Sequence, residues 1–192
     1  MTFDHLRADL RAHRGDWGAQ GFWALAVYRF GRWRYTVRSP WLRKPLSLVY
    51  KLLFKLVQVL TGIELPCEAE IGPGFVIDHS GGIVISGYAK FGAHCRIRNG
   101  VVVGLARVDE PCAPVIGDHV DIGTGAVLLG RITVGDHSLI GANAVVVKDV
   151  PPWSIAVGVP AVVRPRKDRP QAAGADPASA STGPADPADP ET

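Results

Sequence analysis

An aliphatic or phenylalanine side chain recurs at every sixth position through the middle of this 192-residue chain. The phase breaks twice, by two residues just after Asp78 and His79 and by a longer insertion with the sequence "LARVDEPCAPV". A glycine often follows the repeating residue, as at Gly92, Gly117 and Gly135. The residues that lead the hexads are Ile71, Ile77, Ile85, Phe91, Ile97, Val103, Ile116, Ile122, Leu128, Val134, Ile140 and Val146.

A six-residue period predicts a short strand followed by a tight turn in each repeat. The leading residue points into a narrow interior, and the glycine or small residue permits the bend between flat faces. Three such faces close one triangular coil, so we predict a mainly β fold, a parallel β-helix of about four stacked coils. The strands of an ordinary β-sandwich would not keep a six-residue phase from Ile116 to Val146 without interruption.

The first sixty residues follow a different pattern, with apolar side chains three and four positions apart. This spacing predicts helices in "FDHLRADLRAHR", "GFWALAVYRFGRWRY" and "PWLRKPLSLVYKLLFKLVQVL", and Pro40 and Pro45 suit the start of the third. Lys51 and Lys55 interrupt its apolar run, which argues against a membrane span. The excess of Lys and Arg leaves two interpretations open: peripheral contact with an anionic membrane or partner, and a solvated face of a helical subdomain.

These patterns divide the chain into a helical N-terminal subdomain (1–62), a β-helix domain (63–167) and a tail (168–192). The tail is dense in Pro, Ala and Asp and almost free of large apolar residues. Such a segment buries too little surface to offset its chain entropy, so we expect it to be disordered.

The three cysteines, Cys67, Cys95 and Cys112, are odd in number and show no paired metal-type spacing. They favour a reduced protein. Charged residues near the start of the chain, where a signal peptide needs an apolar core, argue against secretion. We therefore expect a cytoplasmic location, and we expect no nucleic-acid partner.

The candidate catalytic residues lie in the stretch "GFVIDHSGGIVI", from Gly74 to Ile85. There Asp78 and His79 interrupt a run of apolar residues, and two glycines follow shortly after them. An imidazole with a pKa of about 6.5 can take a proton from a hydroxyl group near neutral pH. No third ligand stands at a telling spacing, so we expect no metal. The other histidines of the repeats, His94, His119 and His137, are interpreted as exposed turn residues.

The hexads, "IDHSGGIVI" and the ending "IGANAVVVKDVPPWSIAVGVPAVV" resemble the left-handed β-helix acyltransferases, and among them the serine O-acetyltransferase family. The resemblance extends from about Arg7 to Arg166, since "FWALAVYRFGRW" is similar to that family's last N-terminal helices. It implies a left-handed coil and direct transfer of acetyl from acetyl-CoA to a hydroxyl group on a small-molecule acceptor. It also implies a homotrimer or a dimer of trimers.

The resemblance assigns roles to three residues around the opening motif. His79 stands where the family has its general base. Glu64 stands fifteen positions earlier, where the family has the aspartate that orients this base; a glutamate can hold the same tautomer through a longer arm. Asp78 matches the family's acidic contact to the amino group of the substrate.

The resemblance also locates the acetyl-CoA site. Small residues along the coils suit the extended pantetheine arm, and cations near the last coil suit the phosphates of CoA. For the two cations the alternative interpretation is a solvated surface charge. The expected cofactor-binding residues are Gly104, Gly123, Thr124, Gly141 and Ala142, with Lys148 and Arg164 as the cations.

The insertion departs from the family. Its members carry an Arg-His pair that helps to hold the amino acid, and here the pair falls on Cys112 and Ala113. Arg107 is the candidate to replace the contact to the substrate carboxylate. Three functions remain open: O-acetylation of L-serine toward cysteine, O-acetylation of a sugar hydroxyl in a surface polysaccharide, and a non-catalytic scaffold. The chain ends in "DPET" rather than in the isoleucine with which family members dock the sulfhydrylase, which argues against that complex.

Overall fold

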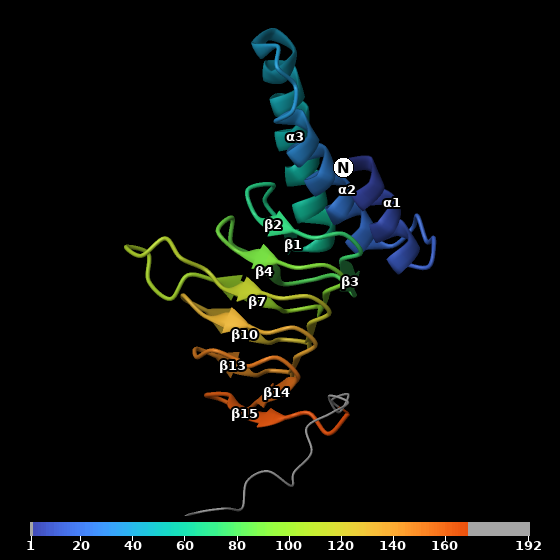
Figure 1. Ribbon diagram of the computed structural model, residues 1–192. Coiled ribbons are helices and arrows are strands. Elements are labelled where there is room, and N and C mark those ends of the chain that lie inside the picture. The colour runs from blue at the N-terminus through green and yellow to red at the C-terminus, as the bar shows by residue number, and fades with distance from the viewer. Residues whose placement is uncertain (1, 169–192) are drawn as a thin grey trace, which may run out of the picture.

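The computed structural model describes residues 2–168, and it places three helices before a stack of short strands (Figure 1). The helices are α1 (Thr2–Ala12), α2 (Gln20–Arg34) and α3 (Pro40–Thr61), which confirms the helical periodicity of the first sixty residues. The expected disordered tail lies outside the described residues, apart from Asp168. The strands are β1 (Ile63–Glu64), β2 (Glu70–Ile71), β3 (Val76–Asp78), β4 (Ile83–Ile85), β5 (Lys90–Phe91), β6 (Arg96–Arg98), β7 (Val102–Gly104), β8 (Val115–Ile116), β9 (Asp121–Ile122), β10 (Val127–Leu129), β11 (Thr133–Val134), β12 (Leu139–Ile140), β13 (Val145–Val146), β14 (Ser154–Val157) and β15 (Val162–Pro165).

The strands form three sheets, which are the three faces of a left-handed parallel β-helix. Each strand pairs in parallel with the strand one coil away, and β15 alone among the described strands runs antiparallel, against β14. The hexad leaders stack in register, so that Ile77 pairs with Ile97 and Ile97 with Ile122. All twelve leaders are buried, which confirms the prediction that they fill the interior.

The stack is one coil longer than expected, because the face that begins with β1 contains five strands, β1-β4-β7-β10-β13. The additional coil is divided between the two ends: the segment "IELPCEAE" adds β1 before the first leader, and Val150 and β14 follow the last leader. Ile63 of β1 and Leu65 just after it are buried like the leaders, and Leu65 lies six positions before Ile71, in phase with them. The repeat therefore extends one hexad further toward the N-terminus than the twelve predicted leaders.

The turns at one corner of the β-helix carry a row of aromatic rings. His94, His119 and His137 lie at the corner with positive φ, and their rings stack on one another and on Trp153. The ring centroids are 5.0, 4.8 and 4.4 Å apart along the row. The three histidines are turn residues as expected, but they also bridge successive coils, a contact that the sequence pattern did not indicate.

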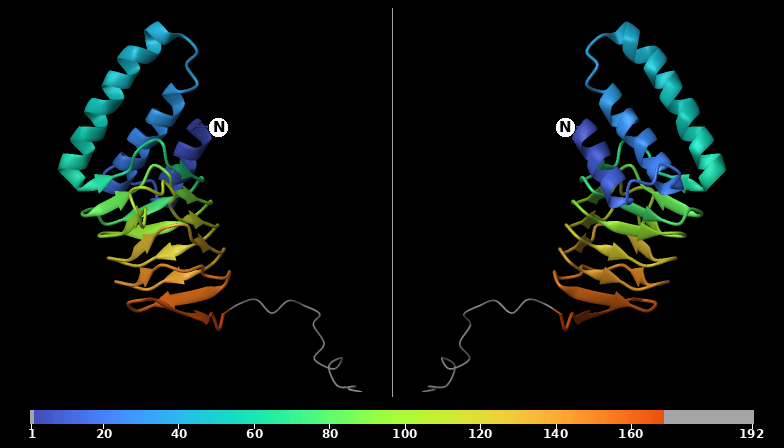
Figure 2. Two further views of the ribbon diagram at one scale, coloured as in Figure 1. Left: turned by 90° about the vertical axis from the view of Figure 1, so that its left-hand side faces the viewer. Right: turned by 90° about the vertical axis from the view of Figure 1, so that its right-hand side faces the viewer.

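Helices α1 and α2 cover the open N-terminal end of the β-helix (Figure 2). Their buried polar groups bond the backbone of the first coil, which has no preceding coil to pair with. Tyr28 Oη donates to the carbonyl of Ala69 at 2.9 Å and accepts from the amide of Ile71 at 3.0 Å. The Arg29 guanidinium donates to the carbonyls of Ile71 and Gly72 at 2.7 and 2.6 Å. The helices therefore act as a cap on the sheet edges.

Within residues 2–168, no helix combines the length and the apolar character that a membrane span requires. The longest, α3, packs on α2 and on β1. It ends at Thr61, and the following Gly62 adopts the left-handed conformation (φ 64°) that a glycine takes most easily before the chain enters β1.

Candidate active site

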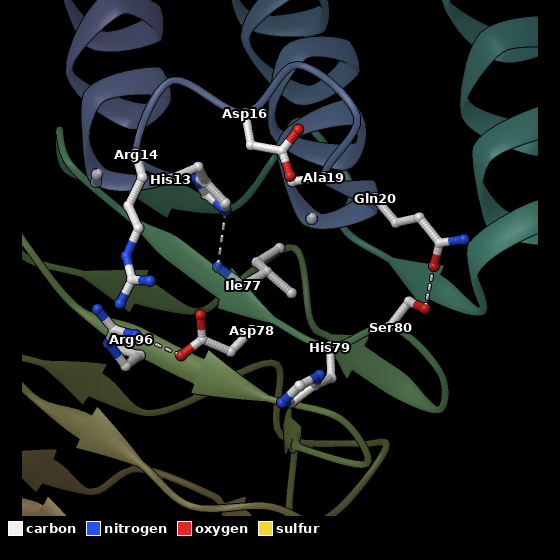
Figure 3. A pocket seen from close by; sticks show the side chains of 12 residues that line it. His13, Arg14, Asp16, Ala19, Gln20, Ile77, Asp78, His79, Ser80 and Arg96 are labelled. Atoms are coloured by element: carbon white, nitrogen blue, oxygen red, sulfur yellow. Dashed lines mark hydrogen bonds and ion pairs between the residues drawn. The ribbon is translucent and has the colours of Figure 1, made fainter.

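His79 follows β3 at a corner of the β-helix, beside a cavity of about 610 Å³ (Figure 3). The cavity lies between the end of α1 with the α1–α2 loop on one side and the strands β3 and β6 on the other. His79 adopts a left-handed backbone conformation (φ 62°), and Gly81 and Gly82 follow it with positive φ as well. The tight corner turns the exposed imidazole out of the sheet, so that a substrate in the cavity can reach it.

The acid beside His79 is held by an arginine one coil away. Asp78 and Arg96 form an ion pair across the neighbouring strands β3 and β6, and both side chains are partly exposed. Arg14, from the loop after α1, points toward Arg96 from the opposite wall (Figure 3). The lining of the cavity thus contains two guanidinium groups, with the carboxylates of Asp78 and Asp16, and a guanidinium can pair with an anionic group of a substrate.

The helical cap holds the strand that carries Asp78 and His79. The amide of Ile77 donates to His13 Nε2 at 3.3 Å, and His13 Nδ1 hydrogen-bonds the carbonyl of Asp9 at 2.8 Å. This pairing requires a neutral His13 ring that donates from Nδ1. Gly21 packs so closely that a Cβ added there would lie 2.3 Å from the Ile77 carbonyl oxygen. The cap thus fixes the position of β3 directly next to His79.

A further contact ties the residue after His79 to the cap. Ser80 donates a hydrogen bond from its hydroxyl to the side-chain oxygen of Gln20, at the start of α2 (Figure 3). His13, Arg14, Gln20 and Arg96 were not identified from the sequence. The signal for Arg96 was available, because "RIR" in β6 places polar side chains on either side of a buried leader.

Glu64, the expected orienting acid, lies at the end of β1 and is partly buried. Its carboxylate accepts a hydrogen bond from Gln58 Nε2, on α3, at 2.9 Å. Within residues 2–168, no hydrogen bond joins Glu64 to His79. Its role in orienting the imidazole stays a proposal.

The insertion places Arg107 in an exposed loop after β7. There its guanidinium pairs with Asp109 at 3.1 Å and lowers the pKa of that carboxyl group. Arg107 does not line the cavity beside His79. Ala113 is buried and Cys112 is partly exposed, so neither provides a charge for an acceptor.

The expected acetyl-CoA residues lie along the later coils, and three of them are glycines with different surroundings. A Cβ on Gly123 would lie 2.6 Å from the amide nitrogen of Ala142, and one on Gly141 would lie 2.7 Å from Val157 Cγ1. Close stacking of the coils therefore explains these two glycines. A Cβ on Gly104 would meet its nearest neighbour at 3.9 Å, so the backbone there is open to a ligand.

The remaining expected cofactor contacts are polar or charged. Thr124 Oγ1 donates a hydrogen bond to Asn99 Oδ1, in the neighbouring coil, at 3.2 Å. Lys148 and Arg164 are exposed, and in the part of the chain that the structure describes neither forms an ion pair. Lys148 also borders a small cavity of about 70 Å³ with Val146 and Ala161. Among residues 2–168, no group of three or more His, Cys, Asp or Glu side chains is arranged to hold a metal ion.

Comparison with known proteins gives one family model and several similar proteins. Residues 113–148 match the family model for the bacterial transferase hexapeptide (six repeats). The chain is similar to the serine acetyltransferase of Synechococcus elongatus, with 37% identity over 141 residues, 73% of this chain and 55% of that protein. It is similar to the serine acetyltransferase of Helicobacter pylori, with 38% identity over 142 residues, 73% of this chain and 79% of that protein.

The fold is similar to solved structures of the same kind. The Neisseria gonorrhoeae serine acetyltransferase in complex with serine superposes with a TM-score of 0.72 and 29% identity, over 85% of this chain and 69% of that one. The chain spans little more than half the length of the Synechococcus relative.

Proposed function

Because this chain belongs to the serine acetyltransferase family, to which the Helicobacter relative matches it over most of that protein's length, we propose that it is an acetyltransferase. It moves the acetyl group of acetyl-CoA to a hydroxyl group, and L-serine is the first acceptor to consider. The observation that carries the proposal is the placement of Asp78 and His79 together at the wall of a cavity large enough for a substrate.

In the proposed reaction His79 acts as the general base. Acetyl-CoA supplies the acetyl group as an activated thioester. The imidazole accepts the proton of the acceptor hydroxyl as its oxygen bonds to the acetyl carbon. It returns that proton to sulfur as the carbon–sulfur bond breaks, so that CoA leaves as a thiol. A positioned base of this kind contributes about 10²–10⁴-fold to the rate.

Three other residues support the base and the acceptor in this proposal. Glu64 orients the His79 ring, and Asp78 receives the amino group of a serine acceptor. Arg107, the sequence-based candidate for the serine carboxylate, requires its exposed loop to reach the acceptor. Arg96 already stands beside Asp78 within the cavity, which supports a role for it in holding an anionic group of the acceptor.

The proposed contacts to acetyl-CoA are the open backbone at Gly104 and the cations Lys148 and Arg164, with the small residues between them. The open position at Gly104 suits the narrow pantetheine arm, and the uncompensated charges suit phosphate groups. The residues proposed to hold acetyl-CoA are Gly104, Gly123, Thr124, Gly141, Ala142, Lys148 and Arg164.

We further propose a homotrimer or a dimer of trimers and a cytoplasmic location. Although β1 contributes Glu64, the face β1-β4-β7-β10-β13 supports assembly, since its outward side chains from β4 onward are apolar and at least partly exposed. They are Val84, Val102, Val127, Leu129 and Val145. The cysteines are free thiols within the described residues, in keeping with a reducing compartment.

A second candidate function is O-acetylation of a sugar hydroxyl, as in surface polysaccharide synthesis. Two observations favour it. The cavity beside His79, at about 610 Å³, lies in the range that holds drug-sized ligands and exceeds what a single serine fills. The loop after β7 also has Cys112 and Ala113 where the family's Arg-His pair is expected.

Acetyl-CoA turnover, followed by loss of the thioester absorbance, tests the proposal with L-serine and with free sugars as acceptors. We expect His79→Ala to lower kcat by about 10²–10⁴-fold while acetyl-CoA affinity is unchanged. His94→Ala is the matched control, since His94 has the same left-handed backbone on another coil, and we expect it to retain activity. Turnover with sugars but not with serine selects the second function. Failure to bind acetyl-CoA contradicts both and leaves the non-catalytic scaffold.

A further inference from the structure

Helix α3 presents an apolar face that no described part of the chain covers. Its inner side packs through Tyr50, Phe54 and Val57. At 100° per residue, the exposed apolar residues gather on the other side in one arc of about 140°. Figure 2 shows α3 at the outer edge of the helical layer. The exposed apolar side chains are Trp41, Leu42, Leu48, Val49, Leu52, Leu53, Leu56, Val59 and Leu60.

The charges on α3 are all positive. The helix spans 22 residues and contains no Asp or Glu. Lys44, Lys51 and Lys55 follow one margin of the apolar arc, which is the arrangement of a helix that lies in the interface of a bilayer. Lys55 hydrogen-bonds the neutral Gln58. In the described chain none of the three lysines has an acidic partner.

Charge decides between the possible occupants of this face. A second copy of α3 would bring the same lysines against one another with no carboxylate on either helix, which is unfavourable. The arc is also wider than the narrow seam of a two-helix coiled coil. An anionic lipid surface provides acyl chains for the leucines and phosphates for the lysines. Trp41, exposed at the start of the helix, belongs to the residue type that gathers at the headgroup level.

We propose that the exposed face of α3 docks this protein on the surface of an anionic lipid bilayer. The helix lies in the interface with Leu52 and Leu56 toward the acyl chains. Because α2 covers the opposite side of α3, the helix lies on the membrane and does not cross it. The proposal does not depend on which hydroxyl the protein acetylates.

Vesicle flotation of the full chain tests the docking. We expect the protein to float with vesicles of equimolar phosphatidylcholine and phosphatidylglycerol, less so as salt rises, and not with phosphatidylcholine alone. Replacing Lys44, Lys51 and Lys55 by Gln lowers partitioning by about five-fold for each lysine. The double change Leu52→Glu and Leu56→Glu lowers it by at least about ten-fold.

The matched control is Val108→Glu, the same kind of change at a residue that is 96% exposed in the loop after β7. We expect it to float like the unchanged chain, and circular dichroism checks that each variant is folded. Sedimentation velocity tests the alternative occupant of this face, a second copy of the chain. If the chain ignores anionic vesicles and the double Leu→Glu variant breaks an assembly apart, the face joins two copies and membrane docking is refuted. Equal binding to neutral vesicles refutes the anionic preference, and equal loss in Val108→Glu refutes the role of α3.

Discussion

Replacing Arg29 by Met tests whether the helical cap is held by one buried charge pair. Arg29 Nε donates to Asp9 Oδ2 at 2.8 Å, and the side chains are 4% and 0% exposed. The same guanidinium bonds the carbonyls of Ile71 and Gly72 in the first coil. The change keeps an unbranched apolar stem but removes the guanidinium group, and with it the charge and the hydrogen-bond donors.

The expected loss of unfolding free energy follows from the buried groups that the change leaves without a partner. Asp9 keeps its bond from the amide of Phe75 at 3.1 Å but becomes a buried carboxylate without a counter-charge. Breaking one side of a buried pair costs about 3–5 kcal/mol, against a typical total of about 5–15 kcal/mol for a domain. Removing both charges, with Asp9→Leu and Arg29→Met together, leaves no isolated charge. We therefore expect the double variant to be more stable than Arg29→Met alone.

Urea unfolding followed by circular dichroism measures the free energy, and hydrogen exchange locates the loss. Neighbouring coils of a solenoid stabilise one another mainly in pairs, so the amides of Ile71 and Ile77 lose protection while that of Ile140 keeps it. Since the cap also holds β3 through His13, kcat falls as well. A loss of stability below about 1 kcal/mol, or a loss of protection shared equally by the last coil, would refute this account of the cap.

Two further changes probe the β-helix. Gly123→Ala places a Cβ 2.6 Å from the backbone of Ala142 and lowers the free energy of unfolding by about 1–3 kcal/mol. Gly104→Ala is the control, because a Cβ there has room. Equal melting temperatures of the two variants in thermal denaturation would contradict the stacking argument. In the folded chain a maleimide labels the partly exposed Cys112 but not Cys95, which is fully buried and whose pKa burial raises to about 11. Mass spectrometry that finds Cys95 modified as fast as Cys112 argues against a closed interior.

The repeat was predictable because its information is local. Each leader, such as Ile97 or Leu128, lies next to the residue that forms its turn, and neighbouring coils repeat the same phase. The three helices were predictable for the same reason, since the apolar spacing lies within each segment. The strand β1 was not predicted, although Leu65 continues the six-residue phase, because Pro66 follows it where several other hexads have a glycine.

The site was predictable only in part. Asp78 and His79 stand out because an acid and an imidazole interrupt an apolar run. Arg14 lies on a distant segment, and nothing local to it indicates that it faces the same cavity. The distance between the side chains of Glu64 and His79 likewise depends on how successive strands fold into a coil, and the spacing of the two residues in the sequence does not determine it.

The sequence by itself determined the coil, its buried residues and the identity of the acid–imidazole pair, because these depend on short-range periodicity and residue chemistry. Only the tertiary structure decided how the cap seats on the first coil, which arginine pairs with Asp78 and which face of α3 stays exposed. Those outcomes depend on satisfying buried polar groups and sheet edges between segments far apart in the chain. Such pairings come from packing in three dimensions, and no period along the chain encodes them.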